Sequence, residues 1–126
     1  MSLVNTLVLI VEDDPTQRES EVFGLRRAGH QVLSAGTVQG ALACLERVIP
    51  DVVLLDLTLP DGDGLALGRL LHRAGIPFLI VSARAGAADI EQGQRAGAAD
   101  YLTKPLGLPD IVWRVARLLR QVRPPA

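Results

Sequence analysis

Short, unbroken apolar runs separated by helix-like segments recur along this chain and limit the folds open to it. Three of them cover residues 7–11, 52–55 and 78–81, and a fourth strand segment, 101–103, leads to Lys104. Runs of this length are typical of parallel strands that are buried on both faces. Residues 31–35 are less apolar, so we expect them to form a strand at an edge of the same sheet.

The intervening segments carry helix signals. Asp14 can cap a helix that begins at Pro15, and Gln17 occupies the position of a capping-box partner. Four further helices are expected over residues 38–49, 65–73, 87–95 and 111–122. Apolar spacing supports the first and last of these four. Strands that alternate with helices predict a doubly wound α/β fold of five parallel strands and five helices. The strand order 2-1-3-4-5 would place the first and third strands side by side at a switch point.

The tripeptide Arg-Ala-Gly occurs four times. The copies at 27–29, 73–75 and 95–97 fall where helices should end, with a cation in the last turn and glycine in the left-handed closing position. The copy at 84–86 follows a strand and is expected to form a loop.

The bulk properties indicate one globular domain. A chain of 126 residues has enough core to fold alone, and a net charge of −1 argues against a general grip on nucleic acid. No apolar run is long enough for a membrane span, and Cys44 is the single cysteine, so we expect a reducing cytoplasm as its setting. We expect the domain to cover residues 1–122, with 123–126 as the start of a linker or tail.

Polar residues follow the expected strands at the points where the strands end. Glu12 and Asp13 follow the first run, Asp56 follows the third strand, Ser82 the fourth, and Lys104 the last. In an open α/β sheet the carboxyl ends of the strands border the ligand crevice. Each residue alone could simply end a strand before a turn, but together the five are expected to share one pocket.

Three carboxylates in one pocket repel one another, so either one takes up a proton or a cation intervenes. Hard oxygen ligands favour Mg²⁺, and the scattered His30, His72 and Cys44 offer no zinc site. A carboxylate beside Mg²⁺ can attack a phosphoryl group, whose oxygens Lys104 and Ser82 are suited to meet.

Four blocks of sequence together resemble the receiver domain of two-component response regulators. The blocks are residues 11–14, 54–64, 81–83 and 97–105, and the resemblance extends from about residue 6 to 119. It implies a flavodoxin-like receiver fold and a phospho-accepting regulatory domain, not an enzyme with turnover. Its implied partners are a histidine kinase or phosphotransfer protein and an output domain beyond residue 126, with no membrane contact and no direct nucleic-acid binding.

The resemblance also implies a role for each matching residue. Asp56 would accept the phosphoryl group, and Ser82 and Lys104 would contact its oxygens. Asp13, Asp56 and the Thr58 backbone carbonyl would ligate Mg²⁺, with Glu12 binding through water. Tyr101 would act as an aromatic switch that relays the change to a face formed by the fourth helix, the fifth strand and the fifth helix. The bond between Lys104 and Pro105 would be cis, which aims the lysine inward.

The chain departs from the family pattern on that face. Ala99 stands where DNA-binding relatives often carry an acid, and the fourth helix is polar outside, so dimerisation through this face stays open. Asp100 and Arg114 could still pair, and Trp113 could anchor a partner or cover the helix edge. Arg84 lies where the family tunes hydrolysis of the phosphoryl group, and we expect slower hydrolysis than with an acid there.

Three alternatives remain open. An aspartyl-phosphate hydrolase would also use an aspartate at a strand end, but usually carries a second one two residues on, where this chain has Thr58. A flavodoxin-like cofactor binder needs a phosphate-cradling loop, which the acids 12–14 would oppose. A stand-alone or degenerate receiver would act as a protein-interaction module.

Overall fold

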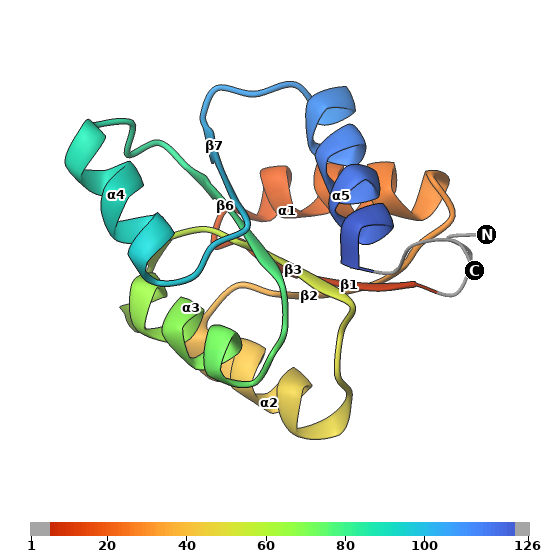
Figure 1. Cartoon of the computed structure of the whole chain (residues 1–126). Helices are drawn as coiled ribbons and strands as arrows, with labels where there is room; N and C mark the ends of the chain where they lie inside the picture. Colours follow the sequence, from red (N-terminus) through yellow and green to blue (C-terminus); the bar gives the residue numbers. More distant parts are fainter. Residues whose placement is uncertain (1–5, 123–126) are drawn as a thin grey trace.

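A five-stranded parallel sheet forms the centre of the molecule (Figure 1). The computed structural model describes residues 6–122. The sheet order is β2-β1-β3-β6-β7, which is the expected 2-1-3-4-5 when only the strands of this sheet are counted. Its strands are β1 (Leu7–Val11), β2 (Gln31–Ala35), β3 (Val52–Leu55), β6 (Phe78–Ser82) and β7 (Asp100–Thr103). The less apolar β2 lies at an edge, as predicted.

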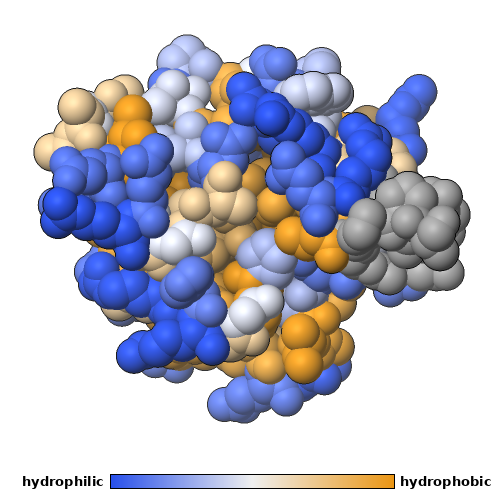
Figure 2. Space-filling model, in the orientation of Figure 1, coloured by the Kyte–Doolittle hydropathy of each residue, from blue (hydrophilic) through white to orange (hydrophobic). Residues whose placement is uncertain are grey.

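Helices cover both faces of the sheet. They are α1 (Pro15–Arg27), α2 (Val38–Arg47), α3 (Gly64–Arg73), α4 (Ala87–Arg95) and α5 (Leu108–Val122). Val8 and Ile10 of β1 belong to the core under α1 and α5, whereas the alternate Leu9 and Val11 belong to the core under α2 and α3. Because helices cover both faces of the sheet, all five residues of β1 are apolar, as the sequence pattern predicted. Hydrophilic side chains cover most of the outer surface of α5 in Figure 2.

The start of α1 differs from the prediction in one respect. Asp14 caps the helix and accepts hydrogen bonds from the amides of Thr16 at 2.9 Å and Gln17 at 3.4 Å. The predicted capping box is wrong, because the side-chain amide of Gln17 does not reach back to Asp14. Its Nε2 atom donates instead to Oε2 of Glu21 at 3.1 Å. The backbone N–H of Asp14, which a capping-box partner would bind, donates instead to Oε2 of Glu12 at 3.2 Å.

Three of the four Arg-Ala-Gly copies end helices in the predicted way. Gly29, Gly75 and Gly97 have φ values of 102°, 75° and 103°, and follow α1, α3 and α4. The copy at 84–86 lies in the loop between β6 and α4.

Two local features were not predicted from the sequence. Residues Thr58–Leu59 (β4) and Gly62–Asp63 (β5) form a small antiparallel hairpin directly after Asp56. Strands of two residues are too short for any periodicity. Helix α2 ends at Arg47, so Ile49 is not part of its apolar stripe and is 79% exposed. Pro50 follows it, and the residue before a proline is disfavoured in a helix. Of the helices in residues 6–122, none could span a lipid bilayer.

Candidate functional site

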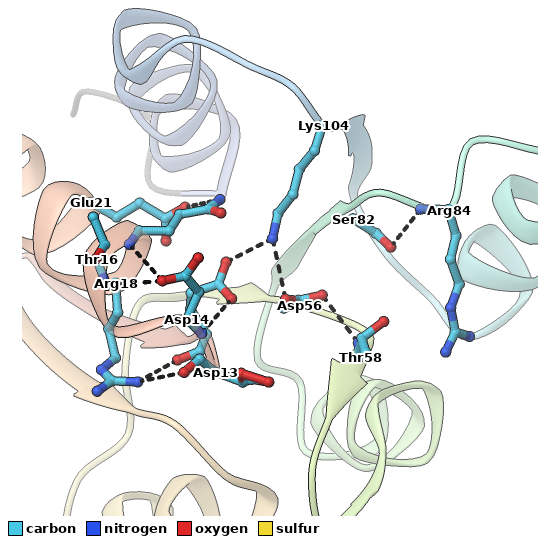
Figure 3. Close-up of polar contacts among 12 residues, drawn as sticks. Asp13, Asp14, Thr16, Arg18, Glu21, Asp56, Thr58, Ser82, Arg84 and Lys104 are labelled. Atoms are coloured by element: carbon cyan, nitrogen blue, oxygen red, sulfur yellow. Dashed lines mark hydrogen bonds and ion pairs between the residues drawn. The ribbon is translucent and has the colours of Figure 1, made fainter.

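Three of the predicted residues meet at the carboxyl-terminal edge of the sheet. Glu12 follows β1, Asp56 follows β3, and Lys104 follows β7. The Nζ atom of Lys104 lies 2.8 Å from Oε1 of Glu12 and 3.2 Å from Oδ2 of Asp56 (Figure 3). The parallel strands of the sheet therefore bring together residues that are up to 92 positions apart in the chain.

The cluster is largely shielded from water. Glu12 is 3% exposed and Asp56 is 8% exposed. Burial raises the pKa of Glu12, and the hydrogen bond from Lys104 only partly opposes this effect. Burial also acts to lower the pKa of Lys104, but its bonds to the two carboxylates outweigh burial and raise it. The ammonium group is thus the cation that intervenes between the two acids.

Asp13 and Thr58 lie beside this cluster (Figure 3). The Thr58 amide donates to Oδ1 of Asp56 at 3.1 Å, which orients the carboxylate. Asp13 is exposed, and within residues 6–122 its carboxylate makes no hydrogen bond. Asp13 is therefore at the same edge of the sheet, but it is free to turn toward a ligand.

The hairpin after Asp56 is attached to α2. Oδ1 and Oδ2 of Asp61 accept hydrogen bonds from the amides of Val38 at 2.7 Å and Gln39 at 3.0 Å. These backbone bonds lower the pKa of Asp61, which stays ionised. The β4–β5 turn is thereby fixed against a neighbouring helix, and the backbone of Thr58 with it.

Ser82 is fully buried at the end of β6, beside Asp56. Its Oγ accepts a hydrogen bond from the Arg84 amide at 3.1 Å. The Tyr101 hydroxyl donates to the Arg84 carbonyl at 2.6 Å. A continuous path thus runs from Ser82 through the Arg84 backbone to Tyr101. The bond between Lys104 and Pro105 is cis, as predicted.

Sequence reasoning missed a buried acid on α1. Glu21 is 3% exposed, and burial raises its pKa to about 7, with the hydrogen bond from Gln17 acting against the shift. It lines a cavity of about 420 Å³ that also includes Lys104 and Ile111. The spacing carried a signal, because Glu21 lies four residues before the buried Leu25 and therefore on the same face of the helix.

Sequence reasoning also missed Arg18. Its side chain crosses to the loop after β1, where its Nη1 atom donates to backbone carbonyls (Figure 3). No periodicity identifies such a contact, since it depends on where two loops lie in space.

The comparisons with known proteins agree on one family. A family model described as the response regulator receiver domain matches residues 8–116. The transcriptional regulatory protein KdpE of Mycobacterium tuberculosis is 39% identical over 117 residues, which are 92% of this chain and 52% of that protein. The phosphate regulon transcriptional regulatory protein PhoB of Klebsiella pneumoniae is 36% identical over 123 residues, or 94% of this chain and 54% of that protein. The chain thus spans about half the length of these relatives.

A solved structure supports the same assignment. The receiver domain of the Francisella response regulator 1452 superposes with a TM-score of 0.88 at 26% identity, covering 94% of this chain and 100% of that one.

Proposed function

The chain belongs to the family of response regulator receiver domains, and on that premise we propose that it is a phosphorylation-controlled signalling switch. Receiver domains of response regulators are regulatory. In this chain Asp56 is proposed to accept the phosphoryl group from the phosphohistidine of a histidine kinase or phosphotransfer protein. The observation that carries the proposal is the buried Asp56 carboxylate, held by the Lys104 ammonium beside a second acid, Glu12.

The transfer would be a displacement at phosphorus. An oxygen of the Asp56 carboxylate attacks the phosphorus atom, the P–N bond of the phosphohistidine breaks, and the imidazole leaves with the electron pair. Lys104 is placed to move from the free carboxylates to the new phosphoryl oxygens. Because Ser82 Oγ accepts its bond from Arg84, its own proton is available for donation to the same oxygens.

We further propose that Mg²⁺ is the cofactor. Asp13, Asp56 and the Thr58 carbonyl would hold it, and Glu12 would bind through water. Within residues 6–122 no three acidic, histidine or cysteine side chains are already gathered as a metal cage. Mg²⁺ needs none, since it usually binds through one or two carboxylates together with phosphate oxygens and water. When bound, the ion would screen the repulsion between the carboxylate and the incoming phosphoryl group.

The signal is proposed to leave the site through the loop after β6. If Ser82 turns toward a phosphoryl group, its bond to the Arg84 amide is lost. The Arg84 carbonyl, which holds the Tyr101 hydroxyl, is then released to move. The ring of Tyr101 packs against α4, so the change reaches the face formed by α4, β7 and α5. The output is proposed to be a separate domain or partner, of the transcriptional kind that the names of the relatives indicate.

Incubation with Mg²⁺ and acetyl phosphate tests this function. We expect one acid-stable, base-labile phosphate per chain in the wild type and none in Asp56→Asn. Repeated turnover of the donor would indicate a phosphatase instead. A chain that takes up no label, although folded, would be a protein-interaction module.

A further inference from the structure

Arg18 reaches the acidic segment of the site from the second turn of α1. Its Nη1 atom donates to the Glu12 carbonyl at 2.7 Å and to the Asp13 carbonyl at 3.3 Å (Figure 3). One guanidinium group thus holds the backbone of both acids that follow β1. Arg18 bonds to the backbone carbonyls of Glu12 and Asp13 and not to their carboxylates. It can therefore affect the carboxylates only by fixing the backbone that orients them.

The position of Asp13 depends on this contact more than that of Glu12 does. The Glu12 amide donates to the Ala35 carbonyl at 3.0 Å, and its carboxylate is held by Lys104. Asp13 has fewer restraints among residues 6–122, because its carboxylate makes no hydrogen bond. The peptide group that carries its carbonyl is held by Arg18 and by the Asp14 N–H, which donates to Oε2 of Glu12 at 3.2 Å. Loss of the guanidinium contact would therefore free the backbone that aims the Asp13 carboxylate.

The loop between β2 and α2 leaves space for the guanidinium at Gly36. A methyl group at this position would lie 2.7 Å from Nη1 of Arg18 and 3.5 Å from its Cζ. The φ angle of Gly36 is not among the positive ones, so the backbone there does not itself require glycine. The absence of a side chain at Gly36 is what admits the arginine.

We propose that Arg18 is a positioning residue for the magnesium site, and that Gly36 provides the space in which its guanidinium holds the Glu12 and Asp13 carbonyls. This inference rests on the proposed function, because it concerns the same site. Partners that orient metal ligands from outside typically change metal affinity by roughly 10- to 100-fold when they are removed.

Charge and geometry make opposite predictions for this residue. A guanidinium near a cation site repels Mg²⁺, so a purely electrostatic role predicts tighter binding when Arg18 is replaced by a neutral residue. A positioning role predicts weaker binding. The sign of the change therefore separates the two.

The test is the Mg²⁺ affinity of the wild type and of four variants, measured by NMR titration of the backbone amides. Gly36→Ala keeps the charge but displaces the end of a flexible side chain, so the fold is retained while the contact is lost. Arg18→Gln removes the donor, and the double variant should bind no more weakly than Arg18→Gln alone. Arg27→Gln removes an exposed charge from the same helix and serves as the matched control.

We expect Gly36→Ala and Arg18→Gln each to weaken Mg²⁺ binding by roughly tenfold or more, and Arg27→Gln to leave it unchanged. The loss in Gly36→Ala should persist at high salt, since geometry is not screened. Wild-type affinity or tighter binding in Arg18→Gln would overturn the inference, and if that variant fails to fold, unchanged binding in Gly36→Ala does so. A wild type that binds no Mg²⁺ would instead refute the proposed metal site itself.

Discussion

Among the individual residues, Lys104 partly offsets the negative charge of the acidic pocket. Lys104 bonds to both Glu12 and Asp56, and these bonds keep it charged in spite of its burial. A phosphoryl group on Asp56 would offer the same ammonium further oxygens. The contacts of Lys104 are therefore those that phosphorylation would change first.

Glu21 makes the stability of the molecule depend on pH. Its pKa is 4.5 in an ordinary environment and about 7 in the folded chain, so the folded state binds the extra proton between these values. Stability is therefore lost as the pH rises from about 4.5 through 7. At about 1.4 kcal/mol per pKa unit the loss is about 3 kcal/mol.

We expect Glu21→Gln to be more stable than the wild type by up to about 3 kcal/mol at pH 8, and to show little difference at pH 4.5. Urea unfolding at the two pH values measures this. Glu19→Gln changes an exposed acid on the same helix and is the control. Equal stability of Glu21→Gln and wild type at pH 8 would show that ionisation of the buried Glu21 does not destabilise the folded state.

Arg84 is expected to slow the loss of the phosphoryl group. Arg84 lies two residues after Ser82, and its backbone amide donates to the Ser82 hydroxyl. Its side chain is exposed. A cation there cannot accept a proton from an attacking water, whereas a glutamate can. In Arg84→Glu we expect hydrolysis up to about tenfold faster, equivalent to about 1.4 kcal/mol of barrier. Decay of the labelled protein measures both rates, and equal lifetimes would contradict this expectation.

At the scale of the element, α4 is fitted to Tyr101 through a glycine. A methyl group at Gly93 would lie 2.7 Å from Cδ2 of Tyr101 and 2.9 Å from Cδ1 of Ile80. The ring thus occupies the space that a side chain on the helix would take. Any turn of the ring has to change its packing against α4.

Gly93→Ala should therefore destabilise the fold by about 1–3 kcal/mol, although alanine favours helices by about 1 kcal/mol over glycine. In a Tyr101→Ala background the same substitution should cost less, since the contact with the ring is gone and only the contact with Cδ1 of Ile80 remains. A double-mutant cycle by urea unfolding measures the coupling. Equal effects of Gly93→Ala in both backgrounds would rule out the packing described.

Some elements could be predicted from the sequence, and others could not. Strands β1, β3 and β6 were predictable because their apolar runs reflect burial on both faces, and the three helix ends at Gly29, Gly75 and Gly97 because the backbone there is left-handed. The β4–β5 hairpin was not, since its strands are held by contacts such as Asp61 with α2. The convergence of Glu12, Asp56 and Lys104 followed from the parallel sheet, whereas the contact of Arg18 depended on the path of two loops.

At the scale of the whole molecule, the pocket couples ligand binding to the stability of the entire domain. A ligand that binds only the folded state stabilises it by about 2.7 kcal/mol at a concentration 100 times its Kd. We expect the wild type to melt at a higher temperature in saturating Mg²⁺ than in EDTA. Asp13→Ala should lose most of this rise, because one proposed ligand is gone. A rise of the same size in Asp13→Ala would place the ion elsewhere.

On the face formed by α4, β7 and α5, Arg114 and Asp100 form an ion pair within the chain. Arg114 donates to Oδ2 of Asp100 at 2.9 Å. Trp113 is 52% exposed, with the guanidinium groups of Arg114 and Arg117 each 5.5 Å from its ring centroid. The exposed ring of Trp113 is thus flanked by two arginines, one of which is paired with Asp100.

Asp56 is proposed to carry the phosphoryl group, and locating the label in the chain tests this. The chain is phosphorylated with a radiolabelled histidine kinase or acetyl phosphate, then cleaved, and the labelled peptide is identified by mass spectrometry. We expect the label to lie on Asp56 and to be absent from Asp56→Asn, while Asp14→Asn retains it. A label on Asp13 or another residue, or full labelling of Asp56→Asn, would contradict it.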